Sequence, residues 1–125
     1  MADLLTEPID IYSDDYIKVL CMDEQGAGGA HHLYHIYKRK DDPATEEPLA
    51  VIKHQEGPIL ENGVNGSTNE AHLAIVAHRL ICFQKGPFPS DFTAAALSGV
   101  DFAKTVLEMR TRDRKARNVE GKDET

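Results

Sequence analysis

The sequence predicts an α+β protein in which an N-terminal antiparallel β-meander is packed on a C-terminal antiparallel helical hairpin. Short segments rich in aromatic and β-branched residues alternate with turn residues through the first half of the chain. Two long segments with apolar residues at helical spacing, joined by a short loop that contains Gly86 and Pro87, make up the second half. A chain of 125 residues is long enough to bury a core without a disulfide or metal staple.

Three strands are expected, over residues 16–22, 31–37 and 49–54, because turn signals bound each of these segments. Their connections are too short for helical crossovers, so neighbouring strands run antiparallel. The Gly-rich loop at 26–29 lacks the Gly-Lys-Ser/Thr ending of a P-loop. Two interpretations of this loop stay open: a flexible hairpin connection, or a loop that closes over a phosphate or ribose of a ligand.

The chain is expected to divide into four parts. These are a small sheet lobe at 1–56, a Gly- and Asn-rich linker without regular structure at 57–66, a helical hairpin at 67–118 and a frayed tail at 119–125. The helices span about 68–85 and 90–116. Ser67 and Glu70 fit a capping box at the start of the first helix, and Gly86 stands where a helix commonly ends. Apolar residues surround the first helix, which is typical of a helix buried on several sides or packed on a second chain.

Charge and composition exclude several classes of partner. The formal net charge of −7 argues against general binding to DNA, RNA or an anionic membrane. Cys21 and Cys82 lie in separate apolar runs, so we expect two buried thiols in a reducing compartment. The N-terminus lacks the pattern of a signal peptide, and no apolar run approaches the ~20 residues of a spanning helix. These observations predict a cytosolic protein.

Neither a metal site nor a catalytic motif is predicted. His31 and His35 share a strand face but lie about 13 Å apart by the strand rise, and His32 points to the other face. His72 and His78 are six residues apart, which does not match the i, i+4 spacing of helical metal ligands. No local hydrolase signature such as G-x-S-x-G occurs. We therefore expect a protein that is not an enzyme and needs no cofactor.

Two groups of side chains are candidates for ligand binding. Arg110 and Arg114 share a helix face, whereas Arg112 faces elsewhere. They either form a solvated helix end that complements the dipole, or contact phosphate groups. At the inter-helix corner, Phe83 and Phe88 either close the core of the hairpin or stack on nucleobases.

Seven segments together resemble one family of phage proteins. They are Gly57–Ile59, Gly63–Glu70, Arg79–Leu80, Phe83–Gln84, Gly86–Phe88, Arg110–Arg114 and Val119–Gly121. This pattern is similar to the helical hairpin shared by the anti-CBASS cyclic nucleotide sponge and the first type of Thoeris anti-defence sponge. The predicted sheet lobe favours the Thoeris type, and residues 28–34 resemble the entry to its second strand.

The resemblance implies a phage anti-defence protein that acts in the cytoplasm of the infected bacterial host. Such a protein binds and sequesters cyclic ADP-ribose isomers (glycocyclic ADP-ribose) without cleaving them, and so blocks activation of the Thoeris effector. The resemblance also implies that CBASS cyclic di- or trinucleotides bind at a second site. It further implies a homo-oligomer in which dimers assemble into a hexamer through the hairpin. The alternatives are a hydrolase of the same signal, an anti-CBASS-only sponge of cyclic oligonucleotides, an interaction module that uses residues 110–117, and a structural phage protein.

The resemblance also assigns roles to individual residues. Phe83 is expected to stack on the base, and Arg110 and Arg114 are expected to clamp phosphates, while Gly99 serves the assembly. Thr93 stands where the family often has Asn, so this polar contact has a shorter reach. The complete set of expected ligand-binding residues is Tyr34, Lys38, Phe83, Gln84, Phe88, Thr93, Arg110, Thr111 and Arg114.

Overall fold

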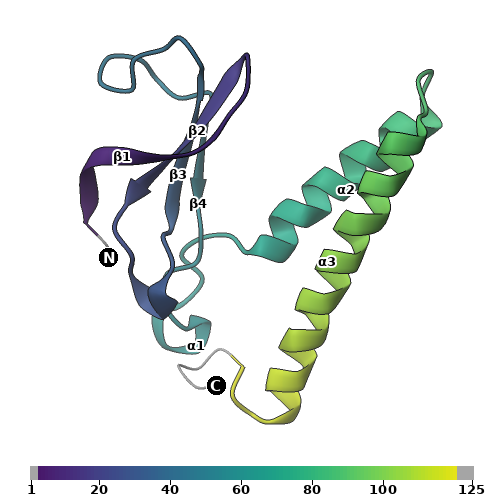
Figure 1. Ribbon diagram of the computed structural model, residues 1–125. Helices are drawn as coiled ribbons and strands as arrows, with labels where there is room; N and C mark the ends of the chain where they lie inside the picture. The colour runs from purple at the N-terminus through teal and green to yellow at the C-terminus, as the bar shows by residue number, and fades with distance from the viewer. Residues whose placement is uncertain (1–2, 121–125) are drawn as a thin grey trace. The chain divides into compact units, whose positions relative to one another are not determined.

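The computed structural model describes residues 3–120, so residues 121–125 of the expected tail lie outside the described residues. The chain forms two compact units, Met1–Ser67 and Thr68–Thr125 (Figure 1). A four-stranded antiparallel sheet precedes two packed helices, which confirms the α+β fold class. The packing of the sheet on the hairpin stays a prediction.

The first unit is a meander with strand order β1-β2-β3-β4. Its strands are β1 (Leu4–Ser13), β2 (Ile17–Asp23), β3 (Leu33–Lys38) and β4 (Ala50–Lys53). Each strand pairs antiparallel with the next, as expected for short connections. The buried apolar side chains of the sheet come from its two central strands, and they are Leu20, Cys21 and Tyr37.

Strand β1 is absent from the sequence prediction, which contains only three strands. Two register shifts interrupt its pairing with β2, one between Leu4 and Ile9 and one between Asp10 and Tyr12. Pro8, which lacks a backbone N–H, lies in the first of these irregular stretches. Most side chains of β1 are exposed. The apolar alternation that identifies a half-buried strand is confined to Ile9 and Ile11, and Pro8 interrupts the segment before them.

Two turns explain residues that are conspicuous in the sequence. The Asp14 carboxylate accepts hydrogen bonds from the backbone N–H groups of Tyr16 and Ile17, both at 2.8 Å, and these bonds lower the pKa of Asp14. They fix the turn between β1 and β2. Between β2 and β3, Gly28 and Gly29 have φ angles of 73° and 79° within a short 3-10 turn. Glycine adopts this left-handed region without a steric penalty.

The segment 57–66, expected to lack regular structure, contains one helical turn, α1 (Ile59–Asn62). Just beyond it the chain returns to the sheet, where His54 and Ser67 form a parallel bridge. The Ser67 N–H donates to the carbonyl of Lys53 at 2.8 Å. Ser67 therefore belongs to this bridge, and the N-cap of the following helix is Thr68, whose Oγ1 accepts from the Ala71 N–H at 3.2 Å.

Replacing Gly66 with Ala is expected to destabilise the first unit. A Cβ atom at Gly66 would lie 2.4 Å from the backbone carbonyl of His54, so the backbone at His54 and Gln55 would have to move away. Overpacking of this kind typically costs about 1–3 kcal/mol of unfolding free energy. Thermal or urea denaturation of the variant measures the loss, and a variant as stable as the natural protein would contradict this account of the bridge.

The second unit consists of α2 (Asn69–Lys85) and α3 (Asp91–Ala116). The Ser90 hydroxyl caps α3 by accepting the Thr93 N–H at 3.0 Å. Gly86 ends α2 as expected, with an extended backbone and a φ of −87°. A Cβ atom there would lie 3.2 Å from the carbonyl oxygen of Cys82, which favours glycine through tight packing.

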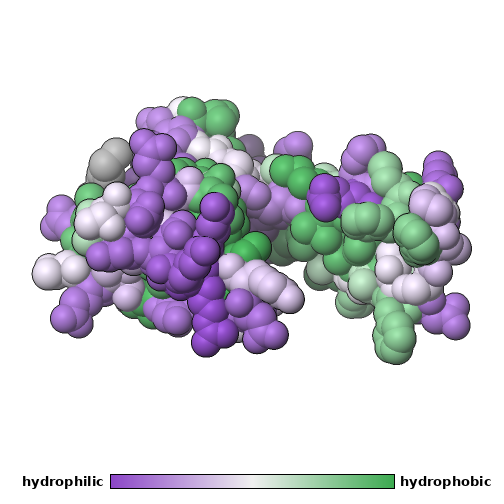
Figure 2. Space-filling model, turned by 90° about the horizontal axis from the view of Figure 1, so that it is seen from above, coloured by the Kyte–Doolittle hydropathy of each residue, from purple (hydrophilic) through white to green (hydrophobic). Residues whose placement is uncertain are grey.

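The hairpin leaves much of its apolar surface exposed (Figure 2). Ala77 is its one buried apolar residue in the described part of the chain, and Cys82, expected to be buried, is exposed. The exposed large apolar side chains of the two helices are Ile75, Val76, Ile81, Phe83, Phe92, Phe102, Val106 and Met109. Contiguous apolar surface on a helix typically marks an interaction site. No helix in the described residues is long and apolar enough to cross a membrane.

Candidate ligand-binding site

The corner between α2 and α3 presents two phenylalanine rings to the surface. Phe83 is 52% exposed and Phe88 is 84% exposed, so neither ring fills a core between the helices of one chain. The guanidinium group of Arg79 lies 5.6 Å from the centroid of the Phe83 ring, a cation–π distance. Sequence reasoning missed this contact, although the i, i+4 spacing of Arg79 and Phe83 is its signal. The corner therefore exposes two aromatic rings, one of them beside a positive charge.

Gln84 and Thr93 lie at the same corner and help to build it. The Gln84 carboxamide oxygen accepts the Ser90 backbone N–H at 2.9 Å. The Ser90 hydroxyl donates to Thr93 Oγ1 at 3.1 Å. Both side chains therefore fix the start of α3, and they hold the loop that carries Phe88 against the end of α2. This places the polar groups next to the exposed rings.

The arginine cluster at the end of α3 contains side chains in two different environments. Arg110 is exposed, whereas Arg114 is buried although it shares the same helix face. The Nε of Arg114 donates to the Glu120 carboxylate at 3.1 Å, and its Nη2 donates to the Val119 carbonyl at 3.0 Å. Arg110 is thus the more accessible of the two expected phosphate ligands.

The start of the tail is ordered and not frayed. Asn118 has a left-handed φ of 59°, and the Val119 N–H donates to the Arg114 carbonyl at 2.9 Å. The Asn118 N–H donates to the Lys115 carbonyl at 3.0 Å. Together these bonds form a Schellman motif, which ends α3 and turns the chain back toward Arg114. Thr111, one turn earlier, bonds to the Leu107 carbonyl at 3.3 Å.

The aromatic corner and the arginine cluster lie at opposite ends of the hairpin (Figure 1). Arg110 follows Thr93 by 17 residues of continuous helix. At 1.5 Å per residue these residues are about 26 Å apart along the axis. One small ligand cannot contact both groups of a single chain. The expected site residues of the hairpin therefore do not converge within one copy.

Tyr34 and Lys38 belong to the first unit, where they share a face of β3. The Tyr34 ring makes an edge contact with His54 at a centroid distance of 5.6 Å, and burial raises the pKa of the Tyr34 phenol. Lys38 is exposed and lines a shallow depression at the sheet surface. The other residues around this depression are Asp15, Tyr16, Arg39 and Lys40. Lys38 to Lys40 form a basic corner that sequence reasoning did not single out.

Comparison with known proteins connects these observations to one relative. No family model matches the chain. Over 76 residues it is 40% identical to a protein of Bacillus phage SBSphiJ7 named Thoeris anti-defense 1. The match covers 61% of this chain and 54% of the phage protein, so the chain spans about half the length of that relative. The resemblance inferred from the sequence is confirmed: the chain is a homologue of a phage Thoeris anti-defense 1 protein.

Proposed function

We propose that this protein is a phage anti-defence protein that sequesters the cyclic ADP-ribose isomer signal of Thoeris in the cytoplasm of the infected host. The observation that carries the proposal is the 40% identity to a Thoeris anti-defense 1 protein. The exposed aromatic corner and the exposed Arg110 supply the two kinds of contact that such a ligand needs. Binding withholds the signal from its effector.

The aromatic ring of Phe83 and the guanidinium group of Arg110 fit two parts of an ADP-ribose, the base and the diphosphate. An exposed phenylalanine ring stacks on a nucleobase, with a contribution of about 1–3 kcal/mol per base. An arginine guanidinium pairs with phosphate oxygens through two parallel hydrogen bonds. Phe83 therefore receives the adenine and Arg110 the diphosphate. The net charge of −7 makes such binding local, because the rest of the surface repels polyanions.

A complete site requires two copies of the chain. Because Phe83 and Arg110 lie at opposite ends of the hairpin, an antiparallel pair of hairpins brings Phe83 of one copy beside Arg110 of the other. Such pairing also covers exposed apolar side chains of the helices, including Phe102 and Val106. The pair contains two equivalent sites related by its two-fold axis. This explains why so many large apolar side chains of the hairpin are exposed in a single chain.

A mixed oligomer tests this arrangement. Copies with Phe83→Ala and copies with Arg110→Ala are co-expressed with different affinity tags, and the mixed assembly is purified. We expect about half of its sites to bind glycocyclic ADP-ribose as tightly as the natural protein, because one site of each pair then has both residues intact. Each homogeneous variant should bind weakly. Weak binding by the mixed assembly would contradict the two-copy site.

The matched control pairs a natural copy with a copy that carries both substitutions. In a two-copy site every site of this assembly then lacks one of the two residues, so no tight site should remain. If each site instead belonged to one chain, this control would keep half of its tight sites and the first mixture would keep none. The two assemblies therefore give opposite results for the two arrangements.

Sequestration differs from hydrolysis in its stoichiometry. A sponge gains nothing from binding a transition state more tightly than the ground state, and needs only ground-state affinity. When the protein is incubated with increasing amounts of the signal and then ultrafiltered, the amount of signal missing from the filtrate should therefore reach a fixed molar ratio to the protein chains. This ratio should not depend on the incubation time. Removal of a large molar excess that grows with time would identify a hydrolase and overturn the proposal.

A further inference from the structure

Three side chains that are distant in sequence meet at one end of the sheet. Asp23 is the last residue of β2, His32 immediately precedes β3, and Glu56 follows β4. His32 Nδ1 lies 3.9 Å from an Asp23 carboxylate oxygen and 3.8 Å from a Glu56 carboxylate oxygen. One potential ligand atom from each residue lies within 4.8 Å of the others. All three belong to the first unit.

The nitrogen between the two carboxylates has no hydrogen-bond partner. His32 is only 4% exposed, and its Nδ1 is the one buried side-chain N or O atom without a partner among residues 3–120. Buried polar atoms in folded proteins are almost always satisfied, so an exception calls for an explanation. A cation placed among Nδ1 and the two carboxylates would give this nitrogen a partner.

The Asp23 carboxylate and the backbone of Glu56 are held in position by hydrogen bonds. The Asp23 carboxylate accepts the N–H groups of His32 at 3.0 and 3.1 Å and of Leu33 at 3.1 Å. The Glu56 backbone exchanges two hydrogen bonds with the Asn65 side chain, each of 2.8 Å. Supporting bonds of this kind orient the ligands of protein metal sites. The Asp23 carboxylate is therefore preorganised, and the backbone that carries Glu56 is fixed.

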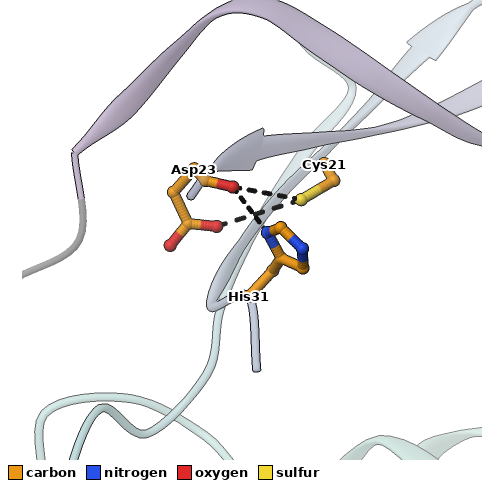
Figure 3. A group of neighbouring side chains, drawn as sticks. All are labelled: Cys21, Asp23 and His31. Atoms are coloured by element: carbon orange, nitrogen blue, oxygen red, sulfur yellow. Dashed lines mark hydrogen bonds between the residues drawn. The ribbon is translucent and has the colours of Figure 1, made fainter. Parts of the chain in front are cut away.

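A neighbouring group of potential ligands is already satisfied by hydrogen bonds. In this group the Cys21 thiol donates to the Asp23 carbonyl at 3.4 Å, and His31 Nδ1 lies 2.6 Å from the same oxygen (Figure 3). Of the two groups, the one with the unpartnered nitrogen is the better cation site.

A pocket that Glu56 lines is acidic. It has a volume of about 380 Å³, and it is lined by Asp3, Glu24, Gln25, Gly26, Ala27, Glu56, Gly57 and Asn62. Three of these residues are carboxylates and none is basic, so the pocket attracts cations and repels phosphate groups. Gly26 of the Gly-rich loop forms part of this wall, which speaks against a phosphate cradle here. Because Glu56 lines this pocket, a hydrated cation has a route to the group.

We propose that Asp23, His32 and Glu56 bind a divalent transition-metal ion through one imidazole nitrogen and one oxygen from each carboxylate. Zn²⁺ accepts this set of ligands with bond lengths of about 2.0–2.2 Å. Mg²⁺ and Ca²⁺ prefer oxygen ligands alone, so the imidazole discriminates against them. The ion links the loop after β4 to the ends of β2 and β3. It stabilises the segment through which the chain leaves the sheet.

Calorimetric titration of the chelator-treated full chain with ZnCl₂ tests the proposal. We expect one Zn²⁺ ion per chain, a higher melting temperature with Zn²⁺ present, and at least tenfold weaker binding of Mg²⁺. Glu56→Gln keeps the shape of the side chain but removes one anionic ligand, and should weaken Zn²⁺ binding at least tenfold. The matched control is Glu46→Gln, a change at an exposed residue outside the site, which should bind like the natural protein.

A surface pair on α2 provides the competing explanation for zinc binding. His78 Nε2 lies 3.9 Å from Cys82 Sγ. Binding that survives in Glu56→Gln but disappears in His78→Ala would assign the ion to α2 and overturn the proposal. Absence of Zn²⁺ binding, or equal binding of Mg²⁺, would overturn it as well. Circular dichroism checks that each variant is folded. The rise in melting temperature that Zn²⁺ causes in the natural protein is a second readout, which does not depend on the folding of any variant.

Discussion

Arg110→Ala is expected to weaken binding of glycocyclic ADP-ribose about 10- to 100-fold, because a hydrogen bond to a charged group contributes about 1.5–3 kcal/mol. Arg110 is exposed on α3 and is the accessible arginine of the face that it shares with Arg114. Isothermal titration calorimetry at low salt measures the loss. The substitution should leave the melting temperature nearly unchanged, since no packed side chain is removed.

Arg112→Ala is the matched control for Arg110. Arg112 is also exposed, but two residues along a helix rotate the side chain by about 200° to the other face. Its removal takes away the same charge and should change affinity less than threefold. Equal losses in the two variants would mean that net charge near the end of α3, and not a specific contact, determines binding.

Phe83→Ala is expected to weaken binding of glycocyclic ADP-ribose about 5- to 100-fold, because it removes a stacking surface that contributes about 1–3 kcal/mol. The ring is half exposed, so its loss leaves no large cavity in the chain. Phe83→Tyr retains the ring and should bind nearly as well as the natural protein. Titration of both folded variants is decisive, and unchanged affinity of Phe83→Ala would remove Phe83 from the site.

Most of the fold is predictable because its boundaries are encoded locally. Ser90 begins α3 as an N-cap, and the Gly86–Pro87 pair ends α2. The strands expected at 16–22, 31–37 and 49–54 correspond to β2, β3 and β4. Strand β1 could not be found in this way, because an irregular edge strand with exposed side chains gains its stability from pairing with β2 and not from its own pattern.

The candidate site is predictable only in part, since exposure depends on contacts that periodicity does not encode. Helical spacing places Arg110 and Arg114 on one face, but the chain reversal at Asn118 brings Glu120 back onto Arg114 alone. The cluster of Asp23, His32 and Glu56 was missed for a similar reason. Sequence reasoning compared histidines within one strand, whereas the sheet register brings together residues from three separate segments. The hexamer and the cyclic oligonucleotide site stay predictions.

The central claim is that the protein holds an intact cyclic ADP-ribose isomer. The most direct test is calorimetric titration of the purified chain with glycocyclic ADP-ribose, followed by heat denaturation of the complex and mass analysis of the released ligand. We predict a nanomolar dissociation constant, which corresponds to a binding free energy on the order of −12 kcal/mol. We also predict one ligand per chain and release of the unchanged cyclic compound. Absence of binding, or release of an opened product, would contradict the account.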